Sequence, residues 1–184
     1  FDYVVANPPF SQKNWMTGFD PSADRYHRFE DGIPPEKNGD YAFLLHIIKS
    51  MKPRTGKGAC ILPHGILFRG NAEEDIRRNL IKRRIIKAII SLPPNLFYGT
   101  GIPACILVLD KENAAARDGI FMIDASKGFI KDGAKNRLRE QDIQKAMDVF
   151  HDYQEIPGYS RMVPLAEIDD NDYNLNLPRY IDSS

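Results

Sequence analysis

Cysteine is scarce in this chain of 184 residues: it has two, Cys60 and Cys105, and each lies inside an apolar run. So few cysteines exclude a disulfide-stabilised scaffold, and we expect two buried, reduced thiols. An excess of either charge is also missing, because 25 Lys and Arg balance 25 Asp and Glu. This balance argues against a protein that coats nucleic acid by net charge alone, although it allows a local basic surface.

Long apolar runs are absent as well. No stretch approaches the roughly 20 residues that span a bilayer, and no signal peptide opens the sequence, so we expect a cytoplasmic protein with no membrane partner. The chain starts at Phe1, inside a strand-like run, which indicates a piece of a longer protein. Its four histidines show no spacing with cysteine or carboxylates that suggests a metal site.

What the sequence does contain is a regular alternation of short apolar runs and helical patterns. The apolar runs predict strands at residues 1–6, 57–62, 85–92, 104–109 and 120–123. Helical spacing predicts helices at residues 41–51, 72–84 and 140–153, with Asp40 as the N-cap of the first. We interpret residues 11–39 and 131–139 as loops and residues 158–184 as an irregular tail.

This order of elements predicts an α/β fold with a mainly parallel sheet and helices on its faces. The strands at residues 85–92 and 104–109 are joined too briefly for a helical crossover. They should therefore be antiparallel, which makes the sheet mixed, with an antiparallel last strand pair.

The clearest chemical signal is Asn7-Pro8-Pro9-Phe10, which follows the first predicted strand. Ligands of open α/β sheets bind at the carboxyl ends of strands. The Asn7 side-chain oxygen and the Pro8 carbonyl can each accept one N–H of a planar amine, and two prolines keep these acceptors fixed. Phe10 can stack on the heterocycle that carries the amine. The alternative interpretation is a strand that ends in a proline-rich turn.

Residues 2–10 (DYVVANPPF) resemble the catalytic motif of DNA adenine-N6 methyltransferases. The resemblance extends along most of the chain, to the modification (M) subunit of type I restriction-modification systems. It includes residues 39–45 (GDYAFLL), 61–68 (ILPHGILF), 92–103 (LPPNLFYGTGIP) and 174–180 (NLNLPRY).

The resemblance implies a partial S-adenosylmethionine-dependent methyltransferase (Rossmann-like) fold. Residues 1–125 would be the C-terminal half of the catalytic domain, and residues 126–184 a basic loop, a helix and an irregular tail packed on it. The implied reaction is methylation of a flipped-out adenine in double-stranded DNA, together with a specificity (S) and a restriction (R) subunit. Phe97 best matches the aromatic residue that stacks on the flipped base, and Tyr98 is the second choice. A core aromatic at the sheet edge is the alternative for Phe97.

One part of the family pattern is missing. The glycine-rich cofactor loop should precede the catalytic motif, where only six residues stand, and neither Gly99 and Gly101 nor residues 54–58 replace it. Of the cofactor site, only Asn7 is expected here, so the isolated chain should bind S-adenosylmethionine weakly or not at all. Without partner strands, residues 1–6 form an exposed apolar edge, which we expect another segment, chain or copy to cover.

Two basic stretches are weaker candidates for contact with DNA phosphates. The first comprises Arg77, Arg78, Lys82, Arg83, Arg84 and Lys87. Its favoured interpretation is a helix face exposed to solvent. The second is loop-like and somewhat better suited to phosphate; it comprises Lys131, Lys135, Arg137 and Arg139. His64 follows a strand and could touch cofactor or base, but a structural histidine in a turn is favoured.

Three functions therefore stand open. The first is DNA adenine-N6 methylation by the parent protein. The second is a non-catalytic module that docks on a specificity subunit through the tail from residue 169. The third is methylation of a glutamine side chain, whose amide is also a planar amine; the later segments favour DNA.

Overall fold

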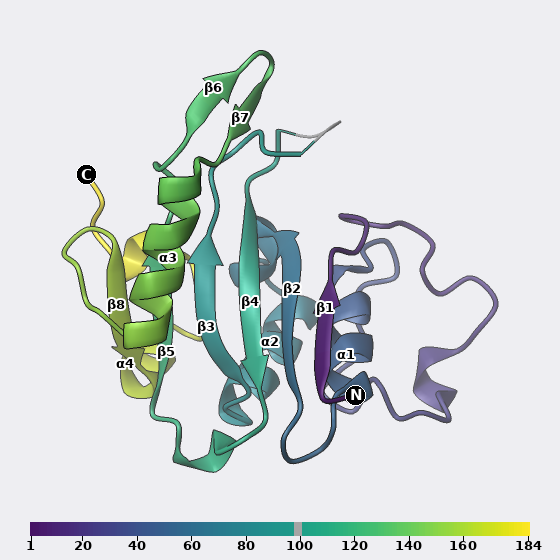
Figure 1. Ribbon diagram of the computed structural model, residues 1–184. Helices are drawn as coiled ribbons and strands as arrows, with labels where there is room; N and C mark the ends of the chain where they lie inside the picture. The colour runs from purple at the N-terminus through teal and green to yellow at the C-terminus, as the bar shows by residue number, and fades with distance from the viewer. Residues whose placement is uncertain (98–100) are drawn as a thin grey trace.

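A six-stranded mixed sheet forms the centre of the computed structural model, which describes residues 1–97 and 101–184 (Figure 1). Its strands run in the order β1-β2-β4-β3-β5-β8. Their bounds are β1 (Tyr3–Ala6), β2 (Lys57–Pro63), β3 (Ile86–Ser91), β4 (Ala104–Asp110), β5 (Gly119–Asp124) and β8 (Ser160–Pro164). All five predicted strands are present.

The pairing of these strands sets where a site can form. β1 pairs with β2 in parallel and β3 with β5 in parallel, whereas β4 is antiparallel to both β2 and β3. The antiparallel pair predicted from the short connection, β3 and β4, is confirmed. Because β1, β2, β3 and β5 point the same way, the residues that follow them meet at one edge of the sheet.

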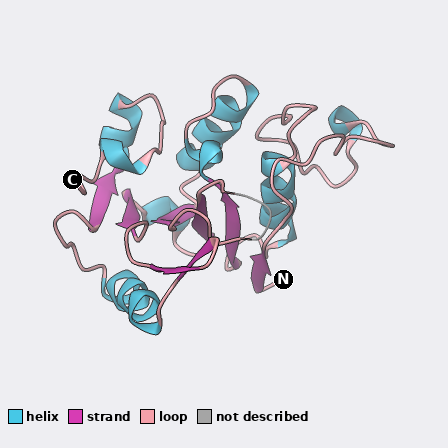
Figure 2. Cartoon of the chain, turned by 90° about the horizontal axis from the view of Figure 1, so that it is seen from above, coloured by secondary structure: helices cyan, strands magenta, loops and turns pink. Residues whose placement is uncertain are grey.

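Helices cover both faces of the sheet, as the view from above shows (Figure 2). The larger core lies on the face of α1 (Asp40–Ser50), α2 (Ala72–Lys82) and α4 (Leu165–Asp170). A smaller core lies under α3 (Glu140–Asp152) on the opposite face. Successive side chains of a strand point to opposite faces of the sheet, so the buried strand β5 contributes to both cores. Ile120 and Met122 belong to the larger core, and Phe121 and Ile123 belong to the smaller one.

Cover is incomplete at the β1 end of the sheet. Val4 and Ala6 pack on the larger core, but Tyr3 and Val5, on the other face of β1, are 75% and 85% exposed. Within the described residues, β1 pairs with β2 alone. The expectation that another segment, chain or copy covers this edge stays a prediction.

Residues 131–139 do not form the loop that their charges suggested. They contribute to a two-stranded hairpin, β6 (Ile130–Asp132) and β7 (Lys135–Arg137), which we call the basic hairpin. Its turn has Gly133 at φ 64°, a conformation that glycine adopts without strain. The Asp132-Gly133 pair is a hairpin signal that the sequence interpretation missed.

The tail beyond residue 158 is also more regular than predicted. β8 adds an antiparallel edge strand to β5, and α4 follows it directly. Arg161 of β8 forms an ion pair with Glu167 of α4 at 2.5 Å, which ties the two elements together. The proposed division of the chain at residue 125 stays a prediction, and residues 126–184 contribute one strand to the main sheet. No helix in the described part of the chain has the length and apolar character needed to cross a membrane.

Both cysteines lie in the sheet interior, and this gives a first testable expectation. Cys60 and Cys105 are fully buried, and burial raises the pKa of Cys60 to about 12 and the pKa of Cys105 further. A thiol reagent at pH 8 should therefore leave both residues unmodified in the native protein and modify both in denaturant. Rapid native-state reaction of either cysteine would contradict the buried placement.

Candidate active site

The site candidate is the turn formed by residues 7–10, here called the catalytic turn, at the carboxyl end of β1. Asn7 is exposed, and neither its amide nor the Pro8 carbonyl makes a hydrogen bond within the described residues. Two consecutive prolines fix φ at Pro8 and Pro9, which restricts the backbone around both acceptors. This arrangement leaves both oxygens available to an external donor.

A buried carboxylate holds the chain directly after the catalytic turn. Ser11 has φ 50°, and its backbone N–H donates to Asp40 Oδ1 at 2.6 Å. One residue further, the Gly39 N–H donates to the Gln12 carbonyl at 2.9 Å. The N-terminus of α1 therefore anchors the exit from the catalytic turn.

Asp40 is itself held by an ion-pair network. Arg69 Nη2 lies 2.7 Å from Asp40 Oδ2, and Arg69 Nε lies 2.8 Å from Glu73 Oε1. Burial raises the pKa of Glu73, and the Arg69 guanidinium opposes that shift. The prediction of Asp40 as N-cap is wrong: Gly39 occupies the cap, and Asp40, the first helical residue, is fully buried.

The two predicted stacking residues lie in contact. The rings of Phe10 and Phe97 have centroids 5.9 Å apart and planes inclined at 77°, an edge-to-face pair. Phe97 is half-buried and comes from the connection between β3 and β4 (residues 92–103), which we call the β3–β4 loop. This contact places Phe97 against Phe10 of the catalytic turn, and Phe97 belongs to neither of the two buried cores. Tyr98, the second choice, lies outside the described residues.

His64 fastens the ends of the β3–β4 loop. Its backbone N–H donates to the Pro103 carbonyl at 2.9 Å, and its Nε2 shares a hydrogen bond with Ser91 Oγ. This agrees with the structural role favoured from the sequence. Burial lowers the pKa of His64, and the nearby Asp124 carboxylate opposes that shift.

The lowered pKa of His64 gives a pH dependence. The unfolded chain takes up a proton on His64 near pH 6.5, whereas the folded protein keeps the ring neutral to a lower pH. This contribution to stability is complete above pH 6.5 and is lost as the pH falls toward the folded-state pKa. The loss of stability between pH 7 and pH 5, measured by urea unfolding, should be smaller in His64→Gln. Equal slopes in the two proteins would contradict the assignment.

The first basic stretch is not simply a solvated helix face. Arg77 is 2% exposed and donates to the carbonyls of Tyr173 at 2.9 Å and of Arg69 at 2.8 Å. Its side chain therefore links α2 to these two backbone segments. Arg83 forms an ion pair with Asp31 of the loop at residues 11–39. The expected solvated face is therefore wrong for Arg77, whose side chain serves the fold.

The second basic stretch is divided between exposed and engaged side chains. Lys131 is exposed, and Arg137 forms an exposed ion pair with Asp132 at 3.6 Å. Arg139 instead forms two hydrogen bonds with Asp142 at the start of α3. Lys135, on the same strand as Arg137, is half-buried. Lys131 and Arg137 are therefore the better phosphate candidates of the four.

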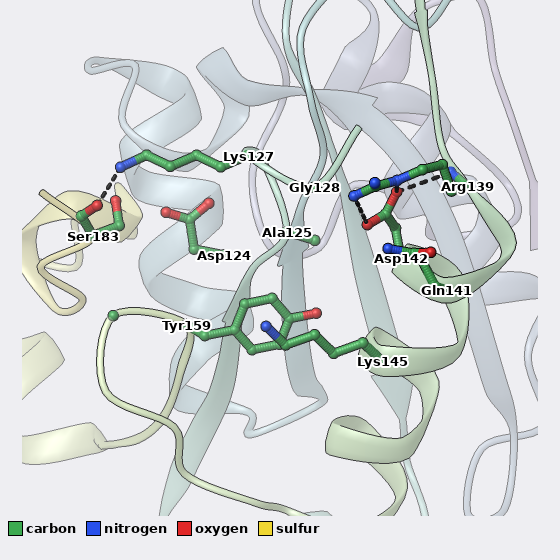
Figure 3. A pocket seen from close by; sticks show the side chains of 11 residues that line it. Asp124, Ala125, Lys127, Gly128, Arg139, Gln141, Asp142, Lys145, Tyr159 and Ser183 are labelled. Atoms are coloured by element: carbon green, nitrogen blue, oxygen red, sulfur yellow. Dashed lines mark hydrogen bonds and ion pairs between the residues drawn. The ribbon is translucent and has the colours of Figure 1, made fainter. Parts of the chain in front are cut away.

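A separate cavity of about 500 Å³ lies between the carboxyl end of β5 and the start of α3 (Figure 3). Its cations have local contacts: Lys127 Nζ donates to the Ser183 carbonyl, and Lys145 Nζ lies 3.9 Å from the centre of the Tyr159 ring. Arg139 lines this cavity, paired with Asp142. No residue of the catalytic turn lines the cavity.

Two functional features escaped the sequence interpretation. Asp40 carries a helix signal, but nothing local to it indicates a hydrogen bond to Ser11, 29 residues earlier. Asn136 donates to the Pro94 carbonyl at 2.7 Å, which joins the basic hairpin to the β3–β4 loop. The Asp132-Gly133 turn could have revealed the hairpin, but not this contact.

The described residues fit only one side of an S-adenosylmethionine site. Asn7 is exposed, and its amide makes no hydrogen bond within the described residues, so it is available to a ligand. No described glycine-rich turn joins a strand to a helix at the carboxyl edge of the sheet. Within the described residues, no cluster of three or more His, Cys, Asp or Glu could hold a metal ion.

Comparison with known proteins places this geometry in a family. The sequence profile of the family described as N-6 DNA methylase matches residues 1–184. The chain is 36% identical to the type I restriction enzyme MjaVII methylase subunit of Methanocaldococcus jannaschii, over 98% of this chain and 32% of that protein. It is 34% identical to the MpnII methylase subunit of Mycoplasma pneumoniae, over 100% of this chain and 34% of that protein.

Solved structures agree with the sequence relatives. The methyltransferase subunit of a type I restriction-modification system from Streptococcus thermophilus superposes with a TM-score of 0.88 at 38% identity, over 99% of this chain and 38% of that one. The expected fold, part of an S-adenosylmethionine-dependent methyltransferase fold, is thereby confirmed. The chain spans about a third of the length of the curated relatives it matches. By sequence and by structure, this chain belongs to the N-6 DNA methylase family.

Proposed function

We propose that the protein containing this chain methylates adenine N6 in double-stranded DNA, as the modification subunit of a type I restriction-modification system. The observation that carries the proposal is the catalytic turn, where two acceptors make no hydrogen bond to any described residue and Phe10 packs against Phe97. Family membership and the names of the sequence relatives support the same reaction.

In this proposal the catalytic turn activates the target amine. Asn7 Oδ1 accepts one N–H of the adenine amine and the Pro8 carbonyl accepts the other, which moves the nitrogen from planar toward tetrahedral. The nitrogen lone pair then points away from the ring and can attack an electrophilic carbon. After transfer the nitrogen is cationic and strongly acidic, so its proton leaves to water and no general base is required.

The aromatic pair would hold the base once it leaves the duplex. An amine inside the base stack cannot reach Asn7, so the adenine has to be flipped out. The edge-to-face contact between Phe10 and Phe97 fills the space between the two rings. A base would therefore stack on the open face of one ring, with the edge of the other ring beside it.

S-adenosylmethionine would supply the electrophilic methyl group, and its methyl–sulfur bond would break as the nitrogen–carbon bond forms, which releases S-adenosylhomocysteine. Of this chain, Asn7 would contact it, and the remaining binding residues would come from other parts of the protein, since the chain spans about a third of its relatives. The isolated chain should consequently bind the donor weakly or not at all.

The partners follow from the same assignment. Relatives are named as subunits of restriction enzymes, so we expect a specificity subunit that sets the DNA sequence and a restriction subunit. The exposed cations of the basic hairpin, Lys131 and Arg137, would meet DNA phosphates. Lys135 and Arg139 belong to the same proposal, although Arg139 would first have to leave Asp142.

The test uses the full-length protein with its specificity subunit. It is incubated with genomic DNA and methyl-labelled S-adenosylmethionine; the DNA is digested, and the labelled nucleoside is identified. Label in N6-methyladenine is the expected result, and sequencing of the methylated DNA then gives the target site.

Other outcomes identify the alternatives. Label in protein, on glutamine, would favour a protein methyltransferase. An unlabelled reaction, from a folded protein that binds the donor, would favour a docking module without catalysis. Either result would overturn the proposal.

A further inference from the structure

The β3–β4 loop is fastened at its ends by the sheet. The Leu92 N–H donates to the Ala104 carbonyl at 2.9 Å, and the His64 N–H donates to the Pro103 carbonyl at 2.9 Å. These bonds fix where the loop leaves and rejoins the strands. They do not by themselves fix the direction of Phe97, which stands five residues beyond Leu92.

The basic hairpin makes a second attachment, close to Phe97. The Asn136 backbone N–H donates to the Asn95 carbonyl at 2.8 Å, and its side-chain Nδ2 donates to the Pro94 carbonyl at 2.7 Å. Asn136 is half-buried in this contact, and the register of the hairpin pairs it with Lys131 on the other strand. One residue therefore satisfies two successive carbonyls of the loop.

The attached part of the loop has a fixed and unusual conformation. Asn95 has φ 55°, in the left-handed region that asparagine tolerates better than most residues. A Cβ on Gly101 would lie 2.8 Å from Asn95 Oδ1, so the returning arm of the loop packs tightly against Asn95. Two residues after this turn, Phe97 meets Phe10 of the catalytic turn.

From this chain of contacts we propose that Asn136 is a positioning residue for base capture. It holds Pro94 and Asn95 and thereby keeps Phe97 against Phe10, which makes the basic hairpin a support of the active site. The inference rests on the proposed adenine methylation. It also assigns to the hairpin a task that charge alone cannot perform, since Asn136 is neutral.

The test compares Asn136→Ala with the unchanged full-length protein, each in complex with the specificity subunit. Duplexes carry the identified target site, with adenine or with 2-aminopurine at the target position; 2-aminopurine fluoresces more strongly when it leaves the base stack. Loss of one side-chain hydrogen bond should lower the single-turnover methylation rate and the fluorescence increase by about two- to tenfold. The dissociation constant for DNA should change less than twofold, because Lys131 and Arg137 are retained.

A matched control separates positioning from a general loss of stability. Asn79 makes the same kind of bond, from its amide to the Asp31 carbonyl at 2.7 Å, but to the loop at residues 11–39. Asn79→Ala should leave the methylation rate and the fluorescence increase at the unchanged protein's values. Asn136→Gln, which retains an amide donor, should recover part of both.

Three results would overturn the inference. The first applies when the unchanged protein methylates adenine: Asn136→Ala then has the same methylation rate and the same fluorescence increase as the unchanged protein. A second is a loss of DNA affinity as large as the loss of rate, which would make the hairpin a DNA contact only. The third is absence of adenine methylation in the unchanged protein, which would remove the proposed function together with this inference.

Discussion

Replacing Asn7 with alanine should reduce DNA methylation by about 100- to 1,000-fold, the cost found when one fixed hydrogen-bonding group is removed from a catalytic site. In the proposed mechanism, the variant lacks one of the two acceptors that would draw the target nitrogen out of plane. Its stability should change by less than about 0.5 kcal/mol, because Asn7 is exposed and has no hydrogen-bond partner within the described residues. Single-turnover methylation by the full-length complex and a urea unfolding curve measure the two effects.

Asn7→Asp gives the matching comparison. The carboxylate keeps the shape of the side chain and its role as acceptor but cannot donate a hydrogen bond. If acceptance of the amine N–H is the function of Asn7, Asp should retain much more activity than Ala. Activity retained in a folded Asn7→Ala protein would remove Asn7 from the mechanism. Equal, complete loss in both variants would instead point to a contact that the amide N–H donates.

The fold is predictable where periodicity and connection length decide it. Apolar runs locate the strands, and the link between residues 92 and 104 is short enough to require that β3 and β4 are antiparallel. The charges of the basic hairpin give no strand signal, and only the Asp132-Gly133 pair indicates its turn. β8 was missed because its pairing with β5 joins residues some 40 positions apart, and local sequence does not encode such a pairing.

The candidate site is predictable to a similar extent. Residue chemistry predicts Asn7, Pro8 and Phe10 as site residues, and the family resemblance predicts Phe97; the structure places Phe97 against Phe10. The residues that hold this arrangement are not predictable. Asp40 and Asn136 act on segments 29 and 42 positions away, through hydrogen bonds to backbone atoms that carry no sequence signature. Reasoning from one sequence therefore finds reactive groups more readily than their supports.

The largest effect on stability should come from Asp40→Ala. The side chain of Asp40 is fully buried and accepts hydrogen bonds from the Ser11 N–H and from Arg69. Its removal leaves the half-buried Ser11 N–H without its acceptor and takes one of two carboxylates from Arg69. We expect the free energy of unfolding to fall by about 3 kcal/mol, at the low end for a broken buried ion pair, because Glu73 still pairs with Arg69.

A surface substitution distinguishes this network from a general effect of removing an acidic charge. Asp118 also pairs with an arginine, Arg84, at 3.8 Å, but its side chain is 96% exposed, so Asp118→Ala should cost less than about 1 kcal/mol in urea unfolding. Similar losses in the two variants would contradict the role of burial.

Asp40→Ala should also lower methylation under conditions where the protein stays folded, because Ser11, next to Phe10, loses its anchor. Asp40→Asn keeps an oxygen acceptor for the Ser11 N–H, so it should preserve more activity than Ala even though it lacks the charge that pairs with Arg69. If Asp40→Asn retains more methylation activity than Asp40→Ala, the hydrogen-bond acceptor at residue 40 matters apart from its charge. That result would show that α1 acts on the reaction by holding the catalytic turn.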